Sequence, residues 1–241
     1  MPHRTTDTPT TLRRDLAAAL RLAERFGFHE GICNHFSVVV PGDEERYLIN
    51  PYGVHWSEMQ PDHLLLIDGE GTVLEGEGEV EATARNIHIA GHRANPRHAA
   101  ILHVHMPHAT ALTMIQDGRL EMAHQTACKF FNRTAYHGFS GVALTEEQGA
   151  DVAKAQADNP HADIIFLAAH GISIGGPSIA MAFDDLYYLE RACKQQILAL
   201  STGRPLAIID DEMVRQTNRE MMQVFEYQAV KHFEALRRTL S

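Results

Sequence analysis

The spacing of hydrophobic residues along the chain changes several times, and each change predicts a new element of secondary structure. Between Thr11 and Phe26, apolar residues recur at helical spacing, and charged residues occupy other positions. This pattern predicts an amphipathic helix that ends at Gly27. Four short runs of strand-forming residues follow, separated by turn sequences, at 36–40, 47–49, 63–67 and 72–74. They predict an antiparallel meander.

After the meander, helices and apolar strands alternate to the end of the chain. Helical periodicity and capping signals predict helices at 80–95, 107–116, 145–157, 178–201 and 210–240. Apolar runs predict strands that begin near residues 100, 164 and 172. Residues 120–139 are the least regular part of the chain, and long irregular segments of this kind often carry function.

Together these elements predict one α/β domain over residues 1–241, with a mainly antiparallel central β-sheet that is flanked by helices. The chain contains no internal repeat and no linker-like segment that would divide it. Residues 1–9 are expected to form a flexible N-terminus. Residues 204–241 are expected to form a helical C-terminal extension.

The overall composition narrows the class of protein. The chain has 21 Lys and Arg residues and 31 Asp and Glu residues, a formal net charge of -10, which argues against nucleic acid or an anionic membrane as partner. No run approaches the roughly 20 apolar residues of a membrane helix, and no signal-peptide core is visible. Three scattered cysteines do not resemble a disulfide framework. A cytoplasmic protein that acts on a small molecule is expected.

Candidate chemistry is concentrated in the segment A-I-L-H-V-H-M-P-H, residues 100–108. His103 and His105 are two positions apart in an apolar strand, so their rings share one face of the sheet. His170 ends another apolar run and is followed by Gly171. Neutral imidazole is a favoured ligand of Zn²⁺, and three histidines with one open position are typical of catalytic metal sites.

Several motifs, in this order, resemble the class II aldolase/adducin family. They are G-I-C-N-H-F-S, I-N-P-Y-G, R-N-I-H-I-A-G-H-R-A-N-P, H-V-H, A-A-H-G-I-S-I-G-G and A-F-D-D-L-Y-Y-L-E-R-A-C-K-Q-Q, between about Leu12 and Ser201. The resemblance implies a three-layer fold and a homotetramer with active sites at subunit interfaces. It also implies a divalent metal, usually zinc with Mn²⁺ or Fe²⁺ as alternatives, bound by His103, His105 and His170.

Two departures from the family pattern bear on the substrate. The sugar-phosphate aldolases carry a Ser-Ser-Glu triplet that includes an acid/base Glu, where this chain has Ala82, Thr83 and Ala84. Glu81 is nearby, but the sequence gives no evident reason for it to replace that Glu. Tyr52 stands where the aldolases place a small hydroxyl residue that holds phosphate. A phosphorylated sugar is therefore disfavoured.

Both departures are typical of the adducin-like branch, which includes decarboxylases of hydroxylated aromatic or pyridine carboxylates. Decarboxylation needs an electron sink and a later proton donor, but no base that deprotonates an alcohol. The resemblance thus implies a metal-dependent lyase that decarboxylates an unphosphorylated hydroxy-aromatic, heteroaromatic or oxo-acid substrate through a metal-stabilised enolate. Alternatives are an aldolase acting on a small hydroxy-carbonyl compound, a non-enzymatic adducin-like scaffold, a ferrous oxygenase and a sugar dehydratase.

Five further residues are candidates for the site. Asn34 is expected to donate to a substrate oxyanion, Tyr52 to contact an aromatic substrate, and Thr83 to retain a substrate hydrogen bond. His124 and Tyr136 lie in the irregular segment where family members place a proton donor, often towards a neighbouring subunit. Each has a plainer structural alternative, such as a loop-stabilising Asn or a packed turn aromatic.

Six further histidines are expected to lie outside the set of metal ligands and substrate contacts. His88 is expected to be a core histidine or one that orients a metal ligand. Exposed positions are expected for His3, His92, His98, His161 and His232.

Overall fold

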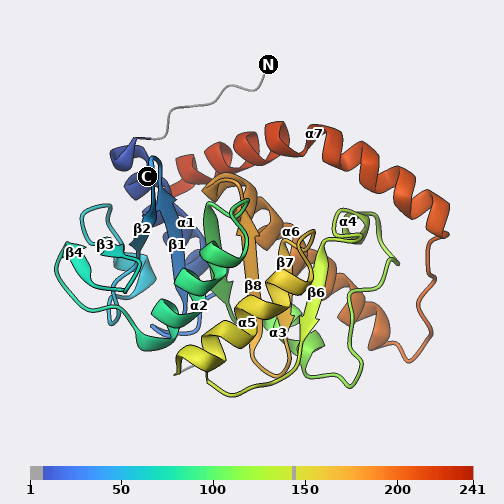
Figure 1. The fold of residues 1–241 in the computed structure, drawn as a ribbon. Helices are drawn as coiled ribbons and strands as arrows, with labels where there is room; N and C mark the ends of the chain where they lie inside the picture. The colour runs from blue at the N-terminus through green and yellow to red at the C-terminus, as the bar shows by residue number, and fades with distance from the viewer. Residues whose placement is uncertain (1–7, 143–144, 241) are drawn as a thin grey trace.

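The structure, a computed structural model, describes residues 8–142 and 145–240 and is built around an eight-stranded sheet (Figure 1). The strand order is β4-β3-β2-β1-β5-β8-β7-β6. The strands are β1 (His35–Val40), β2 (Asp43–Ile49), β3 (Leu65–Asp68), β4 (Val73–Glu75), β5 (Ala100–Val104), β6 (Thr134–His137), β7 (Ile164–Leu167) and β8 (Gly171–Gly176). Neighbouring strands are antiparallel except for the parallel pair β6 and β7.

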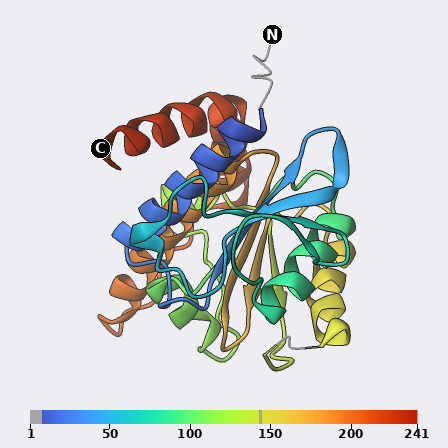
Figure 2. The ribbon, with the colours of Figure 1, turned by 90° about the vertical axis from the view of Figure 1, so that its left-hand side faces the viewer.

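Helices cover both faces of this sheet, which gives three layers (Figure 2). One face carries α1 (Pro9–Arg25), α3 (Pro107–Thr113), α6 (Ile179–Leu200) and α7 (Asp211–Arg237), and the other carries α2 (Ala82–Ala94) and α5 (Glu146–Asp158). Short helices η1 (Trp56–Glu58), α4 (Gln125–Cys128) and η2 (Arg238–Leu240) complete the described elements. The predicted α/β domain with a mainly antiparallel sheet and flanking helices is therefore confirmed.

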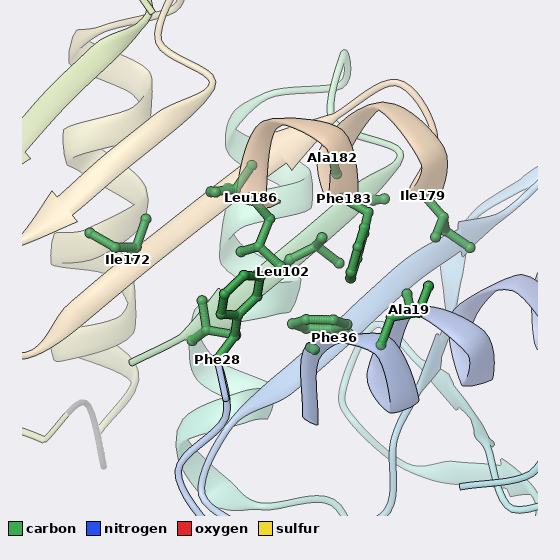
Figure 3. Packing of buried hydrophobic residues seen from close by; sticks show 14 of the residues in the cluster. Ala19, Phe28, Phe36, Leu102, Ile172, Ile179, Ala182, Phe183 and Leu186 are labelled. Carbon is green, nitrogen blue, oxygen red and sulfur yellow. The ribbon is translucent and has the colours of Figure 1, made fainter. Parts of the chain in front are cut away.

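The main core lies between the sheet and the layer that contains α1 and α6. Phe36 on β1, Leu102 on β5 and Ile172 on β8 point from the sheet into this core, where they meet Phe183 and Leu186 of α6 (Figure 3). All five side chains are buried. Burial of a large apolar side chain contributes about 1.5–3 kcal/mol relative to exposure, so this contact fixes the central strands that carry the histidines.

Capping residues determine where three of the helices begin. Thr8 accepts a hydrogen bond from the backbone N–H of Thr11 at the start of α1, and Ser178 does the same for Met181 at the start of α6. The predicted capping box opens α5, where Thr145 and Gln148 bond reciprocally. Each cap satisfies backbone donors that a helix start leaves unpaired.

The irregular segment is the least accurate part of the prediction. It contains the helix α4 and the strand β6, which pairs in parallel with β7 at the edge of the sheet. The strand is only four residues long and partly exposed, so its sequence has too few alternating positions to reveal a period. The helix α3 also ends at Thr113, before the predicted residue 116.

A buried ion network ties α6 to the segment after α4. Asp185 pairs with Lys129 at 2.9 Å and with Arg133 at 2.5 Å, and all three side chains are largely buried. Lys129 also pairs with Asp184, which accepts a hydrogen bond from His232 on α7 at 2.7 Å. Removal of one member would leave an uncompensated charge in the interior.

The chain ends extend these layers. The helix α7 runs along α6 and also contacts α1 and α4 (Figure 1). The prediction for residues 1–9 falls almost entirely outside the described residues, and Thr8 and Pro9 cap and open α1. Across residues 8–142 and 145–240, no helix combines the length and hydropathy that a bilayer crossing would need.

Candidate metal centre

The three histidines of the two predicted strands converge at one end of the central strands. His103 lies on β5, His105 follows the end of β5, and His170 lies in the turn between β7 and β8. Their ring centroids are 5.1 Å, 4.9 Å and 4.9 Å apart, and one nitrogen of each ring lies within 4.8 Å of the other two. The rings therefore face a common point, as the sequence predicts.

The hydrogen bonds behind two of these rings leave the other nitrogen of each available as a ligand. Nδ1 of His103 donates to the backbone carbonyl of Ile172 at 3.0 Å. Nδ1 of His105 donates to the Glu30 carboxylate at 2.7 Å. Nε2 of His105 is buried and has no hydrogen-bond partner among the described residues. A buried polar atom of this kind requires a partner, and a divalent cation supplies one.

The electrostatics of the cluster also suit a cation. Burial, followed by the nearby imidazoles, lowers the pKa of His103 well below its usual value. Burial and the neighbouring His105 lower the pKa of His170 to about 4. Both rings are therefore neutral near pH 7, and the neutral form is the one that binds a metal. The donor set of three imidazoles fits Zn²⁺ or a related divalent ion.

A strained turn brings His170 to its position. Ala169 adopts a left-handed backbone conformation with φ of 51°, and Gly171 follows His170. A Cβ at position 171 would lie 2.5 Å from Cδ2 of His105 and 2.6 Å from the carbonyl oxygen of Val104. Only glycine fits this close approach, so the residue after His170 determines how closely the two segments can meet.

A fourth histidine lies directly against the cluster because of strand register. His35 on β1 is the antiparallel partner of His103 on β5, and the two rings stack with centroids 4.9 Å apart. Burial and the repulsion of the nearby histidines lower the pKa of His35 to about 3. His35 lies in the G-I-C-N-H-F-S motif, but its sequence position alone does not indicate which strand will pair with it.

Behind His35, a row of buried polar groups leads away from the metal centre. Nδ1 of His35 is 2.7 Å from Nε2 of His88, and the Ser37 hydroxyl bonds both His88 and His92. Nδ1 of His92 donates to the backbone carbonyl of His98 at 2.8 Å. These groups satisfy one another in the interior.

This row corrects two of the predicted exposed positions. His92 and His98 are buried, because the backbone carbonyl of His98 and the Asp163 carboxylate replace water as the partners of their rings. His232 is only half-buried and is bonded to Asp184, whereas His161 is exposed and His3 lies outside the described residues. The prediction of His88 as a buried histidine is confirmed.

The loop before β1 places Asn34 and Glu30 together. Asn34 is buried, and its Oδ1 accepts a hydrogen bond from the backbone N–H of Glu30 at 2.7 Å. Its Nδ2 is buried and has no hydrogen-bond partner among the described residues. Glu30 also accepts a hydrogen bond from His105. The same loop therefore carries the buried amide of Asn34 and the carboxylate that orients a candidate metal ligand.

The start of α2 places Thr83 and Glu81 beside His35. The Glu81 carboxylate accepts from the backbone N–H of Ala84, which caps α2, and from the Thr83 hydroxyl. It lies 3.7 Å from Nε2 of His35, and the Thr83 hydroxyl lies 3.3 Å from the same atom. Glu81 is thus next to the ring that stacks on His103, which its position in the sequence does not suggest.

The other three predicted site residues do not contact the histidine cluster of their own chain. Tyr52 is in the turn after β2 with 39 % of its surface exposed. His124 caps α4 and lines a cavity beside α6. The Tyr136 hydroxyl accepts from the backbone N–H of Leu120 at 3.0 Å. Among the described contacts, none joins these three side chains to the histidine cluster.

The fold and the cluster define a class of protein: a three-layer α/β domain with three convergent imidazoles that suit a divalent cation. Within that class, the model of the family "Class II Aldolase and Adducin N-terminal domain" matches residues 14–197. The chain belongs to this family, whose members include metal-dependent aldolases and decarboxylases.

Individual relatives agree with this assignment. The chain is 31% identical over 211 residues to a putative aldolase class 2 protein of Caulobacter vibrioides, covering 87% of this chain and 80% of the relative. It is 30% identical over 208 residues to the decarboxylase NovR of Streptomyces niveus, covering 85% and 75%. The crystal structure of an aldolase II superfamily protein from Pseudomonas syringae superposes with a TM-score of 0.89 at 31% identity, covering 98% and 94%.

Proposed function

We propose that this protein is a divalent-metal-dependent carbon–carbon lyase that decarboxylates an unphosphorylated hydroxy-aromatic, hydroxy-heteroaromatic or oxo-acid. The observation that carries the proposal is the three-histidine centre combined with Ala84, a buried methyl group at the position where family aldolases carry their acid/base Glu. Decarboxylation does not require a base at that position, whereas aldol cleavage does. The relationship to the decarboxylase NovR supports the same choice.

His103, His105 and His170 would hold the cation, with zinc as the proposed ion and Mn²⁺ or Fe²⁺ as alternatives. When bound, the cation supplies a Lewis acid that withdraws electrons from a chelated substrate oxygen. Asn34 then has a specific role, because its buried Nδ2 is an unused donor beside the loop that supports His105. It donates to the substrate oxygen that gains negative charge as CO₂ leaves.

The two other proposed substrate contacts determine selectivity. Thr83 offers its hydroxyl at the start of α2, beside His35. Tyr52 is exposed and bulky where the aldolases place a small hydroxyl residue, so it disfavours phosphate and offers an aromatic face to a planar substrate.

The carbon that loses CO₂ has to take up a proton. Within one chain, Glu81 is the carboxyl group that contacts the ring stacked on His103. His124 and Tyr136 are proposed donors from a neighbouring subunit of a homotetramer with active sites at its interfaces, because neither contacts the cluster of its own chain. Exposed Phe139 and Val142 after β6 support an interface near this region.

The proposal is tested by metal analysis and by CO₂ release from a panel of hydroxy-aromatic, pyridine and oxo-acids. We expect stoichiometric metal and CO₂ release that is lost in His105→Ala and retained in a matched variant of an exposed histidine, His161→Ala. Tight metal binding with neither CO₂ nor an aldehyde as product would contradict the lyase proposal.

The same assay separates the alternatives. An aldehyde product without CO₂ would instead favour an aldolase, a function suggested by the putative aldolase class 2 relative. Deuterium incorporation in Glu81→Gln, His124→Gln and Tyr136→Phe identifies the proton donor, and light scattering gives the mass of the assembly.

A further inference from the structure

A second group of metal-ligating side chains lies outside the centre described above. Glu24 is near the C-terminal end of α1, His29 is in the loop that follows, and His55 is in the turn before η1. One donor atom of each lies within 4.8 Å of the other two. Three separate segments therefore converge here, and the proposed lyase chemistry uses none of these residues.

The distance between the two imidazoles matches that of two ligands on one ion. Nε2 of His29 and Nε2 of His55 are 3.3 Å apart. Tetrahedral coordination with Zn–N bonds of about 2.0–2.1 Å also places two ligand nitrogens about 3.3 Å apart. A direct imidazole–imidazole hydrogen bond would give the same distance, so the distance alone leaves two explanations.

The surroundings of the two rings hold their Nε2 atoms towards each other. Nδ1 of His55 accepts a hydrogen bond from the backbone N–H of Ser57 at 3.3 Å and lies 2.8 Å from the Ser57 hydroxyl, so the cap of η1 orients this ring. Nδ1 of His29 is buried and has no hydrogen-bond partner among the described residues. Trp56 packs against His29 with ring centroids 5.9 Å apart and fixes its orientation.

The third residue favours a cation over a hydrogen bond between the two rings. One oxygen of the Glu24 carboxylate lies within 4.8 Å of one nitrogen of each ring. Two imidazoles and one carboxylate are the donor set of many zinc sites.

We propose that Glu24, His29 and His55 form a second divalent-cation site, separate from the three-histidine centre, that takes Zn²⁺ or a borderline ion such as Co²⁺. The site lies beside the active-site loop, because Glu30, the next residue after His29, holds His105. A cation bound here joins α1, this loop and the turn before η1. The proposal does not depend on which reaction the three-histidine centre performs.

The test counts the ions bound per chain of residues 1–241. Metal-free protein is loaded with Co²⁺, dialysed and analysed for bound cobalt, and the affinity of each site is followed by calorimetry. The wild type is expected to bind two ions per chain, His55→Ala one, His103→Ala one, and the double variant none. The second ion should bind at least tenfold more weakly in His55→Ala and in Glu24→Gln.

His161→Ala, which alters an exposed histidine away from both clusters, should retain two ions. Circular dichroism of the metal-free variants shows whether each is folded, and His55 and Glu24 are only half-buried, so they are the variants of choice. One ion per wild-type chain, or equal binding by the wild type, His55→Ala and Glu24→Gln, would overturn the proposal. Either result leaves the three-histidine centre, tested through His103→Ala, unaffected.

Discussion

Replacement of Glu30 by alanine should weaken metal binding at the three-histidine centre without unfolding the protein. The Glu30 carboxylate accepts a hydrogen bond from Nδ1 of His105 at 2.7 Å, and this bond orients the ring and sets its tautomer. Loss of such a partner typically lowers metal affinity 10–100-fold. The Glu30 side chain is 69% exposed, so solvent screens its charge. We therefore expect a loss of about tenfold, or about 1.4 kcal/mol.

The measurement is a zinc titration in competition with a chelating dye, performed on Glu30→Ala, Glu30→Gln and the wild type. Glutamine retains an oxygen acceptor, so its loss should be smaller than that of alanine. Glu226→Ala, which removes an exposed carboxylate from α7, is the matched control and should bind zinc like the wild type. In metal-free protein, Glu30→Ala should change the free energy of unfolding by less than about 1 kcal/mol.

Two results would refute this reasoning. Equal zinc affinity in Glu30→Ala and wild type would mean that the carboxylate does not orient His105. Equal weakening in Glu30→Ala and Glu226→Ala would mean that only the net charge of the protein matters.

Three further variants test other parts of the structure. Asp185→Ala leaves two buried cations without their shared carboxylate and should lower the free energy of unfolding in urea by about 3–5 kcal/mol; a loss below 1 kcal/mol would contradict this. The pKa of His92 is lowered to about 4 by burial, so unfolding takes up a proton between pH 4 and pH 6.5, and stability falls as pH falls. His92→Gln should remove up to about 3 kcal/mol of the difference in unfolding free energy between pH 7 and pH 4, and an unchanged pH dependence would contradict the assignment. Gly171→Ala should weaken zinc binding at least tenfold in the dye assay, because the new Cβ would lie 2.5 Å from Cδ2 of His105; wild-type affinity would show that the turn can adjust.

The sequence was most informative where a feature depends on neighbours along the chain. The capping residues Thr145 and Ser178 mark the starts of α5 and α6, because a cap bonds backbone groups within three residues. His103 on β5 and His105, just after its end, share a face because strand geometry repeats every two residues. The short edge strand β6 gave no such signal, since four partly exposed residues carry too little pattern.

Features that depend on distant contacts could not be read in this way. In the sequence, His35, His88 and His92 are separate histidines. In the structure, His35 contacts His88 directly and Ser37 joins His88 to His92, which makes one buried row. We predicted that His92 is exposed, because a histidine on an amphipathic helix carries no local sign of burial. No local pattern indicates that Glu81 caps α2 next to His35 either.

By itself, the sequence determined the helices and most strands, the three candidate metal ligands and the resemblance to a family, because these depend on local periodicity and contiguous motifs. The tertiary structure decided which side chains surround the ligands. The order β1-β5-β8 puts His35 opposite His103, and the loop before β1 brings Glu30 to His105. Strand order and register are set by packing of the whole core, so contacts across them are fixed only in the folded chain.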